Sequence, residues 1–222
     1  SMLFNIMTGY SAPRSEWNKI AVAPFDLRKK TISLIDREAR LSTPDNPGHI
    51  IAKMNSLVDP EIIHHLYAAA HANVKIDLII RGICCLKPGV GTENINVISI
   101  VDRYLEHSRI LFFKNGGMQE YYLTSADWMP RNLDRRIELL FPVNDARICE
   151  ILANILQLEL NDTEKSRTLL KSGNYTRKFL DNHLPSRSQR KTYELFKNMA
   201  DNADCDIQKH KKLKIFTSTV KV

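Results

Sequence analysis

The stretch "HIIAKMNSLVDPEIIHHLYAAAHANVKIDLIIRGI", residues 49–83, decides the fold that this sequence predicts. Its first seven residues and residues 74–83 read as strands, and the second strand is apolar on both faces, as in a parallel sheet covered on both sides. Between them lies a helical pattern in which Asp59 can cap the helix and Pro60 suits its first turn. Because a strand–helix–strand unit is joined by a right-handed crossover, the stretch predicts an α/β fold around a parallel pair of strands.

Further strands and helices are predicted on both sides of this unit. Residues 26–42 have helical spacing, and residues 145–160 form a strongly amphipathic pattern with one apolar face. "RILFF" and "EYYLTSA" read as paired strands around the turn "KNGG", and "RRIELLFPV" reads as another strand. "INVISIVDRYLEH" predicts a short strand or a helical turn. The expected architecture is a mixed sheet flanked by helices.

The positive charge of the chain is concentrated in its last part. The formal net charge is +7, yet residues 1–160 carry as many acidic as basic side chains, so the whole excess lies in residues 161–222. We therefore expect three parts: a leading segment or linker (1–25), an α/β half-domain (26–160) and a basic, partly helical appendage (161–222). Residues 165–214 are predicted to hold or guide a polyanion; the alternative is an ordinary solvated helix near residues 188–203.

Composition excludes several classes of protein. No apolar run approaches the roughly 18 residues of a membrane-spanning helix, and no secretory signal pattern precedes the first helix. The four cysteines form no C-x-x-C pair and gain no histidine partners for zinc, which favours buried thiols in a reducing cytoplasm. Ser1 before Met2 reads as a residue left by expression, so we expect a piece of a longer chain.

Three cationic side chains stand next to predicted strands. Arg81 ends the second strand of the central unit, and ligands of open α/β sheets bind beyond the carboxyl ends of strands. His107 and Arg109 lie two residues apart, so both point to one face of an extended chain. An arginine fork and an imidazole suit a phosphate. The alternatives are a surface arginine at a strand end and a histidine bonded to the backbone.

Two further groups of polar residues flank the next strands. Ser125 and Asp127 follow one strand, and Arg135 and Arg136 begin another. Hydroxyl groups and guanidinium groups at one edge of a sheet suit an anion. The alternative is a solvated charge run in which Asp134 pairs with an arginine.

Five stretches of the sequence resemble the C-terminal catalytic domain of bacterial polyphosphate kinase of the first type. These are "NSLVDPEIIHHLYAA", "RGICCLKPGV", "ISIVDRYLEHSRILFF", "NGG" and "YLTSADWMPRNLDRRIEL", which occur in this order. The resemblance covers roughly residues 1 to 195 and implies a phospholipase D-like fold, in which two related α/β halves face each other across one active site.

The phospholipase D superfamily uses H-x-K followed downstream by G-[ST]-x-N. Here His107, Ser108 and Arg109 stand for the first motif, and residues 124–127 stand for the second. The acidic residue that the superfamily has after the first motif would fall at Lys114. This departure argues against a phospholipase activity for this chain.

The resemblance implies a reaction and a set of site residues. Family enzymes reversibly move the terminal phosphate of ATP onto polyphosphate through a phosphohistidine, with Mg²⁺, and release ADP. Carried over by motif, Arg81 and His107 resemble ATP-binding residues, with His107 also catalytic, and Arg136 resembles a further phosphate contact. Arg109, Ser125 and Asp127 are expected to support them.

The same resemblance implies that this chain carries half a site. The phosphohistidine, the family's "GTGNFNE" signature and the magnesium site belong to the preceding domain, so no metal ligand is expected here. Partners would be ATP, ADP, polyphosphate, the preceding domains and other copies in a homo-oligomer. The expected location is cytoplasmic, with possible membrane association. Two alternatives stay open: a noncatalytic module that binds a polyanion or nucleic acid, and an oligomerisation domain.

Overall fold

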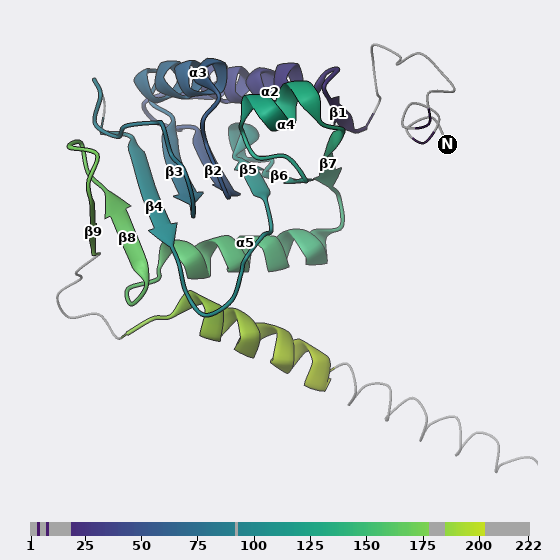
Figure 1. Cartoon of the computed structure of the whole chain (residues 1–222), viewed down its shortest axis with the longest axis vertical. Coiled ribbons are helices and arrows are strands. Elements are labelled where there is room, and N and C mark those ends of the chain that lie inside the picture. Colours follow the sequence, from purple (N-terminus) through teal and green to yellow (C-terminus); the bar gives the residue numbers. More distant parts are fainter. Residues whose placement is uncertain (1–3, 5–7, 9–18, 92, 178–184, 203–222) are drawn as a thin grey trace, which may run out of the picture.

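The computed structural model describes residues 4, 8, 19–91, 93–177 and 185–202 (Figure 1). Within them, nine strands form one sheet in the order β1-β7-β6-β5-β2-β3-β4-β8-β9. The strands are β1 (Ala21–Ala23), β2 (His49–Met54), β3 (Lys75–Ile80), β4 (Ile95–Ile100), β5 (Ile110–Phe113), β6 (Glu120–Thr124), β7 (Glu138–Val143), β8 (Ser166–Leu169) and β9 (Tyr175–Arg177). The sheet is mixed: β2, β3 and β4 run parallel, and the pairs outside them are antiparallel.

The central strand–helix–strand unit forms as the sequence predicts. Helix α3 (Pro60–His71) connects β2 to the parallel strand β3, and the Asp59 carboxylate caps it by accepting from the Ile62 N–H at 3.0 Å. The second oxygen of Asp59 accepts from Arg28 at 2.7 Å, which ties the start of α3 to helix α2 (Leu27–Leu41). The cap therefore also fixes how the two helices lie together.

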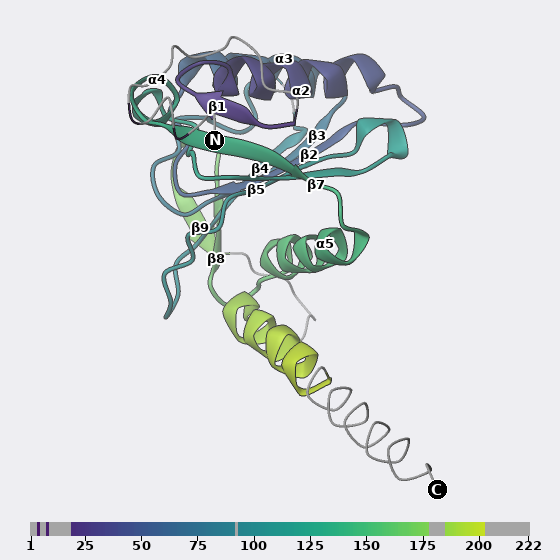
Figure 2. The same cartoon turned by 90° about the vertical axis from the view of Figure 1, so that its right-hand side faces the viewer.

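Helices cover both faces of the sheet. Helices α2, α3 and α4 (Pro130–Arg135) lie on one face, and α5 (Ala146–Leu160) lies on the other (Figures 1 and 2). Alternation along β2 separates two cores: Ile50 and Ala52 pack toward α2 and α3, whereas Ile51 packs with residues of α5. Within the described residues, no helix is long and apolar enough to cross a membrane.

The antiparallel pair β5–β6 around the predicted turn, strand β7 and helix α5 also match the sequence-based expectation. The sequence does not predict strands β8 and β9, which lie in the expected basic, partly helical appendage (161–222). β8 pairs with the edge of β4, and its buried residues are Ser166 and Leu169. The sheet thus continues past residue 160 through β8 and β9, and it begins with β1, which lies within the predicted leading segment 1–25. The sheet therefore extends beyond residues 26–160 at both ends of that range.

The last described part is helical over residues 188–202, close to the prediction of 188–203. Its first turn is tied to the end of α5 by Asp162, whose carboxylate accepts from the Ser188 N–H at 2.7 Å and from the N–H groups of residues 164–166. The rest of the predicted polyanion-binding segment 165–214 lies partly outside the described residues.

We expect a chain that ends at residue 164 to be less stable, because it loses β8 and β9 and leaves the edge of β4 unpaired. Loss of the buried Leu169 side chain alone is worth about 1.5–3 kcal/mol. The melting temperature should fall by about 5 °C or more. Thermal unfolding checks this, with a chain that ends at residue 202 as the control. Equal melting temperatures for the two shortened chains would contradict the structural role of β8.

Candidate functional site

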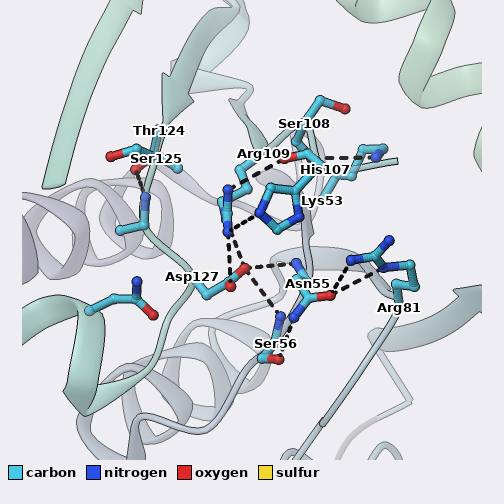
Figure 3. A network of polar contacts seen from close by, with 12 residues as sticks. Lys53, Asn55, Ser56, Arg81, His107, Ser108, Arg109, Thr124, Ser125 and Asp127 are labelled. Atoms are coloured by element: carbon cyan, nitrogen blue, oxygen red, sulfur yellow. Dashed lines mark hydrogen bonds and ion pairs between the residues drawn. The ribbon is translucent and has the colours of Figure 1, made fainter. Parts of the chain in front are cut away.

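Five strand ends meet at one edge of the sheet. The carboxyl ends of β2, β3 and β6 lie beside the amino ends of β5 and β7, as the register shows: Met54 stands opposite Ile80, and Lys53 stands opposite Ile110. The chain leaves these ends into short connections that carry the residues singled out from the sequence. We call this edge the rim (Figure 3).

Asp127, which follows β6, is the centre of the polar contacts at the rim. Its Oδ1 accepts from the backbone N–H groups of Asn55 at 2.8 Å and Ser56 at 3.3 Å and from Arg109 Nε at 2.9 Å. Its Oδ2 accepts from Arg109 Nη2 at 3.1 Å. The buried carboxylate thus joins the ends of β2 and β6 to the start of β5, and its oxygens are engaged by protein donors.

Arg109 also orients His107. Its Nη2 lies 3.1 Å from His107 Nε2, and because a guanidinium can only donate, Nε2 accepts and the ring proton resides on Nδ1. The imidazole is exposed to solvent, whereas the Arg109 side chain is only 11% exposed. The arrangement presents an N–H donor to whatever occupies the rim.

Arg81, which follows β3, is held differently. Its Nε and Nη2 both donate to Asn55 Oδ1, at 3.1 and 2.6 Å. No carboxylate contacts its guanidinium among the described residues, so none of them neutralises its positive charge. Figure 3 shows Arg81 on one side of Asn55 and the Asp127–Arg109–His107 chain on the other.

Ser125 and Arg136 share the rim but not these contacts. The Ser125 hydroxyl donates to Glu138 Oε2 at 2.5 Å, and Asn132 Nδ2 donates to Glu138 Oε1 at 2.7 Å. Arg136 is exposed just before β7, and no polar contact of its side chain is seen within the described part of the chain. The structure thus joins Arg81, His107, Arg109 and Asp127 through Asn55, and it leaves Ser125 and Arg136 beside them.

A buried lysine supports the segment that carries His107. Lys53 Nζ lies 3.3 Å from Glu106 Oε2, 3.3 Å from Glu159 Oε1 and 3.4 Å from the carbonyl oxygen of Ser108. Burial raises the pKa of Glu159 well above its usual range, and the neighbouring Glu106 adds to the shift while Lys53 opposes it. Protonation of Glu159, which the raised pKa favours, would leave Lys53 facing one carboxylate, that of Glu106.

Sequence reasoning missed Lys53, Asn55, Glu138 and Glu159. Asn55 had a usable signal, because it directly follows a predicted strand at the same edge as Arg81. The partners of Glu138 and Glu159 depend on strand register and on the placement of α5, which the sequence alone does not give.

No group of three His, Cys, Asp or Glu side chains comes together within the described ranges. The Asp127 oxygens already accept from Arg109 and from two backbone N–H groups. The described rim residues therefore do not fit a magnesium site.

Comparisons with known proteins agree with the resemblance read from the sequence. The family model "Polyphosphate kinase C-terminal domain 2" matches residues 20–189. Polyphosphate kinase 1 of Chlorobaculum tepidum is 52% identical over 178 residues, which is 79% of this chain and 25% of that protein. A polyphosphate kinase of Synechocystis is 49% identical, with 79% and 24% covered. The chain thus spans about a quarter of the length of these relatives.

Solved structures point the same way. The crystal structure of polyphosphate kinase from Porphyromonas gingivalis aligns with a TM-score of 0.85 and 39% identity, over 90% of this chain and 31% of that one. Nuc of Salmonella typhimurium, a phospholipase D family member, aligns with a TM-score of 0.50 and 15% identity, over 72% of this chain and 97% of that one. The fold is therefore phospholipase D-like, as predicted.

The buried cluster makes a prediction about pH. Because the pKa of Glu159 is raised by folding, the folded chain keeps a proton that the unfolded chain releases above about pH 4.3. Stability contributed by the protonated form is therefore lost as pH rises toward the raised pKa, by up to about 1.4 kcal/mol per pH unit. Glu159→Gln, which is neutral at every pH, should gain stability relative to the unmodified chain as the pH rises above about 5.

Urea denaturation of both chains at several pH values measures this difference. Glu150→Gln, a change on the same helix at an exposed position, is the control and should leave the pH dependence unchanged. Parallel stability curves for the Glu159→Gln variant and the unmodified chain would contradict a protonated Glu159.

Proposed function

The chain belongs to the polyphosphate kinase family, whose second C-terminal domain it matches, and we propose that it supplies the phosphate-binding half of that enzyme's active site. The reaction would be reversible transfer of the terminal phosphate of ATP to polyphosphate. The substrates, ATP, ADP and polyphosphate, would meet this chain at the rim defined by the ends of β2, β3, β5, β6 and β7.

One observation supports this role above the others: of the two arginines held at the rim, one is paired with a carboxylate and the other with an amide. Arg109 is neutralised by Asp127, whereas in the described part of the chain the Arg81 guanidinium is held by the neutral Asn55 side chain and by no carboxylate. A guanidinium held in place without a counter-ion is well suited to a phosphate, which it can bind through two parallel N–H groups. Arg136, exposed at the same edge, would add a second cation.

Charge in a phosphoryl group spreads over its equatorial oxygens during transfer. Fixed donors that face those oxygens lower the barrier because they need not reorganise as water does. His107 Nδ1–H would donate a hydrogen bond to an entering or leaving phosphate oxygen while keeping its proton, so His107 would offset developing charge in both directions of the reaction. Arg109 would be a positioning residue that keeps the imidazole in this tautomer.

The same tautomer argues that His107 is not the phosphorylated histidine. A nucleophilic nitrogen needs a free lone pair, but Nε2 accepts from Arg109 and Nδ1 carries the proton. We therefore propose that the phosphohistidine lies in the part of the parent protein that this chain does not include. Magnesium would likewise come with the nucleotide or from that part, since the rim residues do not fit it.

Two other readings are weaker. A phospholipase-type hydrolysis is disfavoured because Lys114 stands where the superfamily has an acid, and its Nζ donates to Asn46 Oδ1 at 2.6 Å and to the Pro47 carbonyl at 2.8 Å, at the opposite edge of the sheet. A noncatalytic polyanion-binding module would bind polyphosphate without a specific response to ATP. The cytoplasmic location and the homo-oligomer stay predictions.

We expect the isolated chain to make no polyphosphate and to retain no label from terminally labelled ATP, because it lacks the proposed nucleophile. Incubation with the labelled nucleotide and Mg²⁺, followed by gel separation, checks this. Label retained on His107 would contradict the half-site. An ATP-dependent rise in the melting temperature of the same chain separates the proposal from the noncatalytic module.

In the full-length parent protein, Arg81→Ala or His107→Ala should lower the rate of polyphosphate synthesis about 10²- to 10³-fold, as loss of one transition-state donor does elsewhere. Both positions are partly or fully exposed, so the fold should survive. Arg40→Ala, an exposed change at the end of α2, is the control for loss of a surface charge. Near-normal synthesis by either rim variant would refute its assigned role.

A further inference from the structure

A groove of about 200 Å³ lies between the β4–β5 loop and the helical residues 188–202. Figure 1 shows the loop leaving β4, reaching the start of this helix and returning to β5, on the side of the sheet that α5 covers. Three arginines and two tyrosines dominate the lining, which consists of Arg103, Tyr104, Arg187, Gln189, Arg190 and Tyr193.

Two polar ties hold the walls of the groove together. The Gln189 side chain bonds both backbone groups of Tyr104: its Oε1 accepts from the N–H at 2.9 Å and its Nε2 donates to the carbonyl at 2.8 Å. Arg187 donates to both oxygens of Asp102, at 2.7 and 2.6 Å. Loop and helix are therefore fixed to each other, and the groove does not depend on a ligand to form.

The three arginines differ in how far their charge is available. Arg187 is paired with Asp102, whose side chain is only 2% exposed. The hydrogen bonds from Arg187 lower the pKa of the Asp102 carboxyl. Within the described residues Arg190 pairs with Glu194 alone, and both side chains are largely exposed, so the pair is weak.

Arg103 contacts no carboxylate in the described structure. Its guanidinium lies 5.5 Å from the centre of the Tyr104 ring instead. Arg103 and Arg190 thus offer two charges that an anion can use.

The groove and the rim are parts of one segment. The loop that supplies Arg103 and Tyr104 continues through Glu106, which Lys53 holds, to His107. His107 is three positions after Tyr104, so their Cα atoms are at most about 10 Å apart. A linear ligand with its reacting end at the rim could therefore reach the groove with a later part of its chain.

We propose that this groove binds a linear polyphosphate chain, several phosphates away from the end that reacts at the rim; this rests on the proposed function of the rim. Repeated phosphate charges suit Arg103 and Arg190, and the tyrosine hydroxyl groups can donate to phosphate oxygens. A single-stranded nucleic acid would use ring stacking, but Arg103 already lies over the Tyr104 ring. ATP would be too short to occupy the rim and the groove together.

The test uses this chain and the double variant Arg103→Gln/Arg190→Gln. Binding of a labelled long polyphosphate, of tripolyphosphate and of ATP is measured at several salt concentrations. The variant should bind the long chain about tenfold more weakly, which corresponds to losing one or two charge-assisted contacts. The slope of log affinity against log salt should fall by about one for each lost contact. Affinities for tripolyphosphate and ATP should not change.

Arg40→Gln removes one positive charge on the opposite face of the sheet and is the matched control for each single variant. Arg187 is left intact because its loss would strand the Asp102 carboxylate. Removal of the whole basic segment is avoided because it deletes β8. Melting temperatures confirm that each variant is folded, and the single variants Arg103→Gln and Arg190→Gln provide a second measurement.

Three results would overturn the proposal. The unmodified chain could fail to bind long polyphosphate, the double variant could bind it as tightly as the control, or a single-stranded oligonucleotide of equal charge could be preferred. A wrong assignment of the rim gives a different result. The unmodified chain then gives no response to ATP, and Arg81→Ala does not change the affinity for any of the ligands. Binding of the long polyphosphate still depends on Arg103 and Arg190 in that case.

Discussion

The Asp127 carboxylate is the constraint on which the rim depends. A buried charge is stable only when donors surround it, and here two backbone N–H groups and one guanidinium do so. Those donors come from the connection after β2 and from the start of β5, so one side chain fixes three strand ends. Two of these donor residues in turn hold the residues of the site: Arg109 orients His107, and the Asn55 side chain orients Arg81.

This arrangement separates structural charge from available charge. Arg109 and Asp127 neutralise each other at the rim. The buried Lys53 lies between the carboxyl groups of Glu106 and Glu159. Arg81 keeps its charge because its partner is an amide. A site built in this way can attract an anion without leaving an unpaired charge in the core, which is the property that the proposed phosphoryl transfer requires.

The sequence was most informative where local pattern and strand ends decide the outcome. The capped helix between two apolar strands fixed the parallel centre, and the positions of Arg81, His107 and Asp127 beside strand ends predicted a common edge. It was least informative where tertiary contacts decide. β8 is four residues long with a charged arginine inside, and it is a strand because it pairs with the edge of β4 on one side and with β9 on the other. The separate contact of Ser125 with Glu138 likewise depends on the register of β6 and β7.

Net charge by segment was a partial guide to where a polyanion could bind. The excess lies in residues 161–222, yet Arg187 from that stretch is committed to Asp102, and β8 from the same stretch completes the sheet. The charges available in the groove come from two places: Arg190 in the basic segment and Arg103 in the half-domain. A groove made by both explains why a basic segment and the His107 loop should act together. The proposed polyphosphate path therefore depends on the tie between Gln189 and Tyr104 as much as on the number of arginines.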